Sequence, residues 1–373
     1  MPFSSEGVAP GCALAVSGGG FRATLFHLGS LWRLNQLGFL PKLDRISSIS
    51  GGSITAGYLA IKWNKLQFGA SGYAPNFALE VVDPLRAFCS NNIDLIAIGE
   101  SALLPWKKAS DIVEAAYRDK LFGDANLQQL PESPRFVINA TNFATVVSFR
   151  FSKPYAGDYR IGLIRNPKFR ISQAVAASSA FPPVLSPVIL EVDPESFEKT
   201  EGADLYDDAG FRKRLVLSDG GVYDNLGLET VWNRYQTVLV SDAGAPFSFE
   251  CVPDTGWARQ AMRAMDIATN QSRGLRKRAL IADFRSNARN GAYWGILTDI
   301  LKYQAGEALP CPPAAIAELA SLRTRLNAFS EREQCRLINW GYAVCDAALR
   351  SHMQAPNDPA AAWPYPNFAL DRP

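Results

Sequence analysis

Short apolar runs alternate with longer helical patterns over the first 60 residues of the chain. The run CALAV (Cys12–Val16) favours a strand, and the segment FRATLFHLGSLWRLNQLG, after a run of glycines, repeats its apolar residues at helical spacing. A second β-prone run, DRISSI (Asp44–Ile49), is followed by the helical pattern SITAGYLAIKW. Strands that alternate with helices at this spacing predict a mainly parallel central sheet flanked by helices.

The later pattern predicts more strands and then a helical C-terminal part. Residues 135–151 alternate as in a β-hairpin, and residues 171–185 predict a short helix that two prolines end. LVLSDGG and TVLVSDAG each predict a buried strand that ends at an aspartate. An acidic stretch over about 190–214 is expected to form a lid-like insertion. We therefore expect an α/β core over residues 1–250, with a helical region over 251–373 packed on it.

Composition and charge argue against several classes of protein. Hydrophobic residues make up 47 % and charged residues 20 % of the chain, which is typical of a packed globular protein. A net charge of +2 gives no indication of a nucleic-acid partner. No stretch approaches the roughly 18 uncharged apolar residues of a membrane span, and the N-terminus lacks a signal-peptide pattern. Six scattered cysteines without a CxxC pair favour a reduced interior, so we expect a cytoplasmic protein.

The stretch ISSISGGSITAG begins at Ile46, where the second strand meets a helix, and contains four serines. A nucleophilic serine in such a turn needs small residues two positions before and two after it, because the backbone is crowded there. Ser50 meets this requirement best, with Ser48 before it and Gly52 after it. Gly51 and Gly52 would turn the chain into the helix. The alternative is that these serines only cap the helix.

The stretch SGGGFRA places three consecutive glycines between a strand and a helix: Gly18, Gly19 and Gly20. Backbone N–H groups in such a turn bind anions. A P-loop would need GK[ST] at the helix start, and a dinucleotide fingerprint would need glycine in place of Ala23. The other interpretation is an oxyanion hole aimed at the carbonyl that Ser50 attacks. Arg22 is a candidate to hold a substrate phosphate, or else a solvated helix residue.

Asp219 is the first candidate for a base. It ends the run LVLSD and precedes Gly220 and Gly221, at the edge where open α/β sheets bind ligands. An Asp–Gly turn that bonds its own backbone is the alternative, and Asp242 is a weaker rival. An ordinary aspartate has a pKa of about 3.9 and is a weak base, so this chemistry needs a water-poor site and donors that hold the alkoxide.

The chain has only two histidines, His27 and His352. Most serine hydrolases use a histidine as their general base. A triad of Ser50, an aspartate and His352 would follow the chain order of α/β-hydrolases, but no predicted strand precedes His352 to position it. His27 falls inside the first predicted helix. A serine–aspartate dyad and a histidine-dependent triad therefore both remain as interpretations, and the dyad is favoured.

SGGGFRA, SSISGGS, AASSAFPP and SDGGVYDN occur in this order and closely resemble the patatin-like phospholipases, which include the cytosolic phospholipases. The resemblance covers about residues 12–244. It implies a patatin-like three-layer α/β/α sandwich and hydrolysis of lipid acyl esters by a Ser–Asp dyad. Matched motif by motif, it implies these roles: Ser50 as nucleophile, Asp219 as base, Gly18, Gly19 and Gly20 as the oxyanion hole, Arg22 as the phosphate ligand, and Gly51, Gly52, Gly220 and Gly221 in support. Ser48 and Ala23 depart from the glycines of the usual motifs.

These observations lead us to expect a serine lipid acyl hydrolase of the phospholipase A or lysophospholipase type, with no metal and no organic cofactor. A phospholipid or other acyl-ester lipid is the expected substrate, and peripheral contact with a membrane is expected. Residues 93–108 are a candidate for that contact, or else a buried helix. The basic segment 259–285 is a second candidate, for contact with anionic lipid, but a solvated helix face is the favoured interpretation. The alternatives are a soluble His352-dependent esterase and a non-catalytic lipid- or nucleotide-binding protein.

Overall fold

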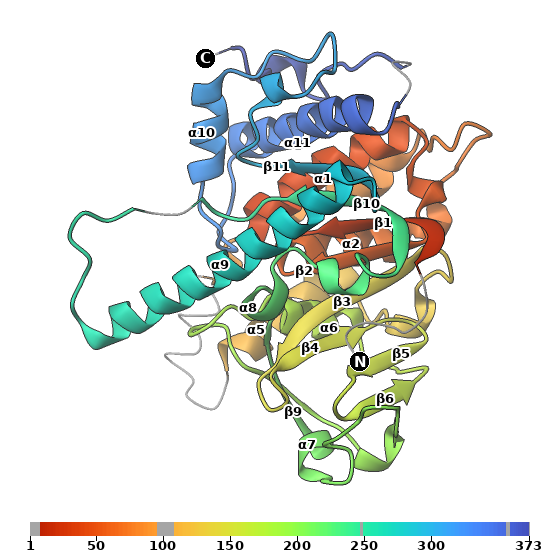
Figure 1. The fold of residues 1–373 in the computed structure, drawn as a ribbon, viewed down its shortest axis with the longest axis vertical. Coiled ribbons are helices and arrows are strands. Elements are labelled where there is room, and N and C mark those ends of the chain that lie inside the picture. Colours follow the sequence, from red (N-terminus) through yellow and green to blue (C-terminus); the bar gives the residue numbers. More distant parts are fainter. Residues whose placement is uncertain (1–7, 95–107, 247–248, 356–358, 373) are drawn as a thin grey trace.

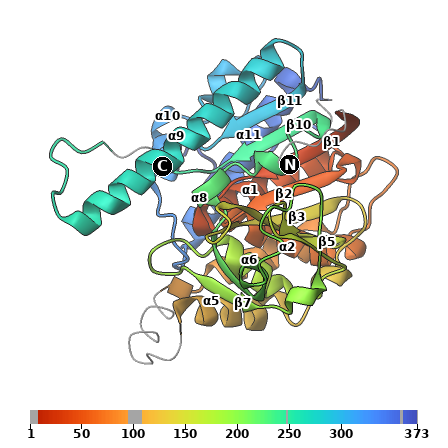
Figure 2. The same cartoon turned by 60° about the horizontal axis from the view of Figure 1, so that its bottom comes forward.

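The computed structural model describes residues 8–94, 108–246, 249–355 and 359–372. These residues form a mixed sheet of 11 strands with helices on both of its faces, and the views in Figures 1 and 2 show one long helix that extends beyond the body. The strands are β1 (Ala9–Val16), β2 (Arg45–Ile49), β3 (Arg135–Asn142), β4 (Val147–Phe151), β5 (Tyr155–Asp158), β6 (Gly162–Arg165), β7 (Val188–Glu191), β8 (Phe197–Glu198), β9 (Arg214–Asp219), β10 (Tyr235–Asp242) and β11 (Asn290–Gly295).

Five neighbouring strands, in the order β11–β10–β1–β2–β3, run parallel at the centre of the sheet. Beyond β3 the sheet continues antiparallel through β4, β5, β6 and β8. Strand β9 also pairs antiparallel with β3, and β7 pairs with β9. The parallel centre with helices on both faces confirms the predicted α/β/α class, and the β3–β4 pair confirms the predicted hairpin.

The helices confirm the two strand–helix units at the start of the chain, because α1 follows β1 and α2 follows β2. They are α1 (Gly20–Gln36), α2 (Gly51–Lys62), α3 (Asp83–Cys89), α5 (Ala109–Tyr117), α6 (Ile171–Ser178), α7 (Gly210–Lys213), α8 (Gly221–Asp224), α9 (Trp257–Arg285), α10 (Pro313–Ser321) and α11 (Glu331–His352). Helix α6 is the short helix expected before the prolines.

Alternate residues of β1 serve the two faces of the sheet. Leu14 and Val16 belong to the large core that includes residues of α1, α2 and α11. Ala13 and Ala15 face a smaller core that includes Leu280 of α9. Because both faces are covered, the strand is apolar throughout rather than alternating, which accounts for the continuous run CALAV.

The C-terminal third was expected to be helical. The structure differs, because this part of the chain also supplies β11 at the edge of the parallel strands. Helix α11 also packs closely on α1, since a Cβ added to Gly29 or Gly341 would collide with a backbone carbonyl of the other helix. A buried ion pair of 2.7 Å joins Arg33 of α1 to Asp346 of α11. The two expected regions, residues 1–250 and 251–373, therefore share one sheet and one core.

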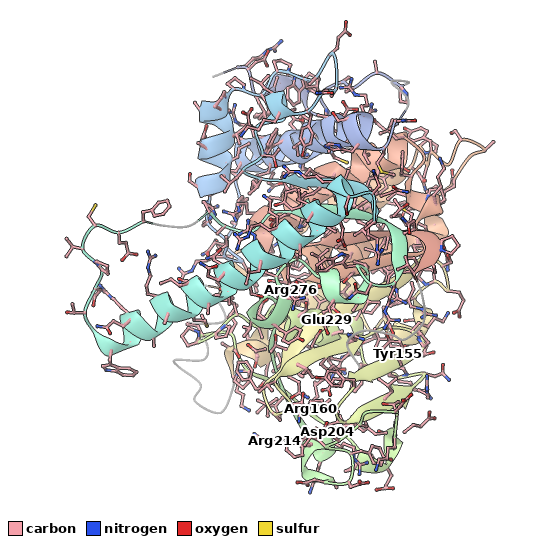
Figure 3. The ribbon with its side chains drawn as sticks, viewed as in Figure 1. Tyr155, Arg160, Asp204, Arg214, Glu229 and Arg276 are labelled. Atoms are coloured by element: carbon pink, nitrogen blue, oxygen red, sulfur yellow. The ribbon has the colours of Figure 1, made fainter. Side chains whose placement is uncertain are left out.

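The acidic insertion over about 190–214 belongs to the antiparallel side of the sheet. Its strands β7 and β8 pair with β9 and β6. Asp204 forms a 2.7 Å ion pair with Arg160, and Arg214 a 3.4 Å ion pair with Glu191 (Figure 3). These pairings hold the insertion against the sheet, so it is not the lid that its composition suggested.

Two segments were considered above for membrane contact. Of the first, 93–108, residues 95–107 lie outside the described residues. The second, 259–285, lies within α9, where only Leu280 is buried, in keeping with the solvated helix that was expected. No helix within the described ranges has the length and apolar character to cross a membrane.

Candidate functional site

Ser50 lies at a strained turn between β2 and α2. Its backbone has φ 51° and ψ −121°, a conformation that non-glycine residues rarely adopt. Neither following residue has room for a side chain, because a Cβ on Gly51 would collide with the carbonyl of Gly20 and one on Gly52 would lie 2.6 Å from that of Ser17. The Ser50 amide donates a 2.9 Å hydrogen bond to Ser178 Oγ of α6. The two glycines and α6 therefore hold Ser50 in a conformation that an isolated chain would avoid.

The glycine run lies directly against this turn. The parallel register of β1 and β2 pairs Val16 with Ser48, which places the ends of both strands side by side. A Cβ on Gly18 would lie only 3.1 Å from that of Ser50. Helices α1 and α2 both begin here, so the partial positive charges of two helix N-termini meet at the Ser50 side chain.

The three glycines do not contribute equally. The amide of Gly18 already donates to the carbonyl of Asn225 at 3.2 Å, so it is not available to an anion. Gly18 instead lets the glycine run pass close to Ser50. Gly19 has φ 140° and Gly20 has φ 56°, which glycine adopts readily. No acceptor for these two amides is found among the described residues. The predicted oxyanion hole of three amides is therefore reduced to two candidates, Gly19 and Gly20.

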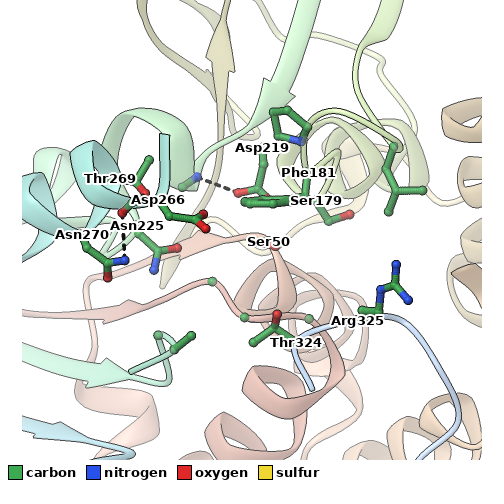
Figure 4. Close-up of a pocket in the computed structure, with 18 of the residues that line it drawn as sticks. Ser50, Ser179, Phe181, Asp219, Asn225, Asp266, Thr269, Asn270, Thr324 and Arg325 are labelled. Carbon is green, nitrogen blue, oxygen red and sulfur yellow. Dashed lines mark hydrogen bonds between the residues drawn. The ribbon is translucent and has the colours of Figure 1, made fainter. Parts of the chain in front are cut away.

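Asp219 lies beside the Ser50 turn but comes from a different part of the sheet. It ends β9, which runs antiparallel to β3 and places Asp219 opposite Ala140. Asp219 accepts a 2.7 Å hydrogen bond from the Gly221 amide (Figure 4), and its carboxylate also interacts with the Ser50 hydroxyl. Gly220 has no room for a side chain beside the carbonyl of Asn139. The tight turn after β9 thus directs the carboxylate at Ser50.

The pKa of Asp219 is raised from its ordinary 3.8 to about 6. Burial is the largest cause, because it disfavours the charged carboxylate. The Gly221 amide, which donates a hydrogen bond to the carboxylate, and the Ser50 hydroxyl beside it act in the opposite direction and offset part of the rise. A carboxylate with a pKa near 6 is a stronger base than an ordinary aspartate and is still ionised at neutral pH.

Ser50 and Asp219 lie in a cavity of about 560 Å³ (Figure 4). One wall is the apolar loop after α6, and another is the face of α9 that carries Met262, Asp266 and Ile267. The segment between α10 and α11 closes a third side with Thr324 and Arg325. None of the residues 190–214 lines this cavity, which is a second reason that the acidic insertion is not its lid.

Arg22 does not lie where a substrate phosphate would be held. Its side chain is 1 % exposed and its guanidinium donates to the carbonyls of Ala320, Leu322 and Ala243 at 2.6, 2.9 and 2.8 Å. Burial lowers its pKa to about 10. The predicted phosphate contact therefore does not fit this structure. Arg22 instead fastens the start of α1 to the C-terminal segment that covers it.

Arg325 is a cavity residue that the sequence did not indicate. Its side chain is exposed, lines the cavity and has no ion-pair partner among the described residues (Figure 4). The two other cavity arginines, both on α9, are already paired: Arg273 with Asp242 at 3.0 Å and Arg263 with Glu250 at 3.5 Å. No local motif marks Arg325, because it lies in a loop and reaches the cavity through the packing of α10 and α11.

Neither histidine lines the cavity. His27 is buried, with Nε2 2.9 Å from the carbonyl of Ser17 and Nδ1 2.8 Å from Ser241 Oγ, and burial lowers its pKa to about 4. It holds the strand end that precedes the glycine run. His352 lies at the end of α11, where its ring packs edge-on against Tyr303. The structure therefore brings no histidine to Ser50.

The rival aspartate has a different role. Asp242 is buried and accepts hydrogen bonds from Tyr293 Oη at 2.6 Å and from the Gly244 amide at 2.8 Å. Burial raises the pKa of Asp242, but Arg273 and these donors more than offset that effect, so its pKa is lowered overall. Asp242 does not line the cavity. The described residues also contain no group of three or more His, Cys, Asp or Glu side chains that could hold a metal ion.

A layered α/β fold with a strained serine turn, a glycine run and an aspartate in one cavity defines the class of this protein. Residues 14–232 match the sequence profile of the family described as Patatin-like phospholipase. Because the match covers more than half of the chain, the chain belongs to the patatin-like phospholipase family.

Solved structures have the same fold. Human GIVD cytosolic phospholipase A2 superposes with a TM-score of 0.54 and 14 % identity, over 93 % of this chain and 61 % of that chain. The same enzyme in complex with methyl gamma-linolenyl fluorophosphonate gives a TM-score of 0.53 and 16 % identity, over 93 % and 59 %. This chain thus spans about three fifths of the length of those structures. A search among curated proteins found no match.

Proposed function

We propose that this protein is a serine lipid acyl hydrolase of the phospholipase A or lysophospholipase type, in which Ser50 is the nucleophile and Asp219 its base. The observation that carries the proposal is that the Ser50 hydroxyl and the buried Asp219 carboxylate line the same largely apolar cavity and interact with each other there. Membership of the patatin-like phospholipase family supports a lipid ester as substrate.

In the first half of the cycle, Ser50 Oγ attacks the carbonyl carbon of the fatty acyl ester and its proton passes to Asp219. The negative charge that forms on the carbonyl oxygen is stabilised by the amides of Gly19 and Gly20. The tetrahedral intermediate collapses by breaking the bond to the alcohol oxygen, which takes the proton from Asp219 and leaves. The acyl group remains on Ser50.

In the second half, water attacks the acyl carbon while Asp219 accepts a proton from it. The same two amides stabilise the second oxyanion. The bond to Ser50 Oγ then breaks, Oγ recovers a proton from Asp219, and the fatty acid is released. Every proton transfer uses a group of this chain, so the cycle requires no histidine.

Two features make an aspartate sufficient as the base. Burial raises the pKa of Asp219 to about 6, which improves its match to the proton that it must accept. The N-termini of α1 and α2 favour negative charge on Ser50 Oγ and on the carbonyl oxygen, which makes the serine easier to deprotonate.

The cavity suits a lipid better than a small polar ester. Phe181, Val184 and Leu185 on one side and Met262 and Ile267 on the other provide apolar surface for an acyl chain. Human GIVD cytosolic phospholipase A2, which has the same fold, forms a complex with methyl gamma-linolenyl fluorophosphonate, and this supports a substrate with a long acyl chain. We further propose that Arg325 contacts the substrate phosphate, because it is the cavity arginine without an ion-pair partner among the described residues.

The test is release of fatty acid from a panel of phospholipids and lysophospholipids by the wild type and by Ser50→Ala, Asp219→Ala and His352→Ala. We expect losses of about 10⁴-fold or more in the first two variants, since the nucleophile and its base act as a unit, and a change below about two-fold in the third. Undiminished hydrolysis by Ser50→Ala would refute the proposal. Loss of activity in His352→Ala would favour a histidine-dependent esterase. No hydrolysis of any lipid by wild type would favour a binding protein.

A further inference from the structure

The N-terminal end of α9 and the loop before it form an arm that leaves large apolar side chains in solvent. Phe249 is 94 % exposed, Val252 89 % and Trp257 86 %. A monomeric soluble protein rarely exposes aromatic and aliphatic side chains so fully and so close together. The arm extends beyond the body in both Figure 1 and Figure 2.

The arm continues directly into the wall of the catalytic cavity. Met262 and Ile267 of the same helix line the cavity and are 45 % and 48 % exposed. Across the mouth, Phe181 and Val184 also line it and are 47 % and 48 % exposed. These four side chains form an apolar rim on two facing sides of the mouth, and the most exposed apolar residues lie at the end of the helix that forms one of these sides.

The body end of α9 is anchored. Arg276 approaches Asp224 at 3.7 Å and Glu229 at 3.8 Å, in the region labelled in Figure 3, and Arg273 is bound to Asp242. Trp257 and Met262 are five positions apart, which corresponds to about 7.5 Å along a helix axis. Interfacial segments bury their apolar faces about 5–10 Å deep in a lipid surface. Insertion of the tip would therefore bring the rim to the level of the lipid.

The charges on the arm indicate what kind of surface it fits. Between residues 249 and 263 there are two acidic and two basic side chains, and they pair with each other. Asp254 binds Arg259 at 2.6 Å, and Glu250 lies 3.5 Å from Arg263. The net charge of the arm is thus zero, so it is suited to an uncharged or zwitterionic lipid surface rather than a strongly anionic one.

We propose that this arm docks the protein on a zwitterionic lipid surface by inserting Phe249, Val252 and Trp257, and so places the mouth of the cavity against its substrate. The proposal rests on the proposed lipid hydrolase function. Three protruding side chains cover far less than the roughly 800 Å² per partner of a stable protein–protein interface, whereas a few apolar anchors suffice at a lipid surface.

The chain offers its own reporter, because Cys251 lies on the arm and is the one exposed residue among the six cysteines. We would label it with an environment-sensitive fluorophore in a Ser50→Ala background, so that bound lipid is not hydrolysed, and titrate phosphatidylcholine vesicles. The test variant carries Phe249→Ser, Val252→Ser and Trp257→Ser. The matched control carries Leu79→Ser and Leu301→Ser, which remove exposed leucines outside the arm.

We expect vesicle binding to weaken about ten-fold or more in the arm variant and less than about two-fold in the control, because affinity follows the apolar area inserted. Raising salt from about 0.05 M to about 0.5 M should change wild-type binding by less than about two-fold, since the arm has no net charge to screen. With Ser50 restored, the arm variant should hydrolyse a monomeric short-chain ester as fast as wild type. This rate also shows that the variant is folded.

Equal vesicle binding by the arm variant and wild type would overturn the proposal. So would a change of oligomeric state, seen by sedimentation velocity, without a change in vesicle binding, because a second copy would then cover the arm. Failure of wild type to hydrolyse any ester would instead refute the proposed function. The binding measurement remains decisive in that case, because it does not depend on catalysis.

Discussion

Replacement of Asp219 by asparagine should stabilise the protein while it abolishes catalysis. The folded chain holds this carboxyl with a pKa of about 6, against an ordinary value of 3.8. Above pH 6 the folded state must therefore bury a carboxylate that the unfolded chain exposes to water, which costs about 3 kcal/mol at 1.36 kcal/mol per pKa unit. Asparagine has nearly the same shape, is neutral and can still accept the hydrogen bond from the Gly221 amide.

The sign of the effect follows from the raised pKa. The folded state binds this proton more tightly than the unfolded state does, so at low pH the carboxyl is protonated and its burial does not lower the free energy of unfolding. Stability is lost as pH rises from about 4 to about 6 and is then constant. Asp219→Asn should accordingly raise the free energy of unfolding by up to about 3 kcal/mol at pH 8 and by about half as much at pH 5.

The assay is urea denaturation of wild type and Asp219→Asn at pH 8 and pH 5. Asp242→Asn is the matched control, because the pKa of Asp242 is lowered by Arg273 and that substitution should destabilise the fold. If Asp219→Asn at pH 8 had the same free energy of unfolding as wild type, or a lower one, burial would not raise the pKa of Asp219. The account of Asp219 as a strengthened base would then fail.

Further predictions concern catalysis, the turn and the two arginines. Because Asp219 must be ionised to accept a proton, kcat/KM for a lipid ester should rise with pH through about 6 and then level off, and a flat pH–rate profile from pH 4.5 to 8 would contradict this. Gly51→Ala should lower the free energy of unfolding by about 1–3 kcal/mol in urea titrations and reduce turnover, because the added Cβ collides with a carbonyl of the glycine run. Wild-type stability and wild-type turnover in this variant would count against the strained turn. Arg325→Ala should raise KM about ten-fold for a phospholipid but not for an uncharged acyl ester, and equal effects on both substrates would argue against a phosphate contact. Arg22→Met should reduce the free energy of unfolding by about 3 kcal/mol in the same titrations, because three buried carbonyls lose their hydrogen-bond donor. A shift in head-group preference at unchanged stability would instead indicate that Arg22 binds the substrate phosphate.

The sequence predicted those features that depend on local pattern. The first two strand–helix units follow from apolar periodicity, and Ser50 was selected because its neighbours two positions away are small. In the structure the same crowding recurs as the collisions that a side chain at Gly51 or Gly52 would cause. Local sterics are recorded in local sequence, so this part of the candidate site could be predicted.

Features that depend on distant packing could not be predicted in this way. Asp219 was expected at the C-terminal end of a strand and does end β9, but no local pattern showed that β9 would pair antiparallel with β3 and so bring Asp219 to Ser50. Arg22 was expected to face the substrate, but carbonyls 221 to 300 residues away in the sequence bind it. Arg325 and β11 are likewise positioned by long-range contacts that no short motif records.

The central claim is that Asp219, without a histidine, makes Ser50 nucleophilic. A long-chain alkyl fluorophosphonate tests it most directly, because an activated serine Oγ displaces fluoride and forms a stable phosphonyl ester that mass spectrometry of peptides can locate. We predict modification of Ser50 in the wild type, none in Ser50→Ala, a rate at least about 10²-fold lower in Asp219→Asn, and an unchanged rate in His352→Ala. Modification at another residue, or a rate that depends on His352 and not on Asp219, would contradict the account.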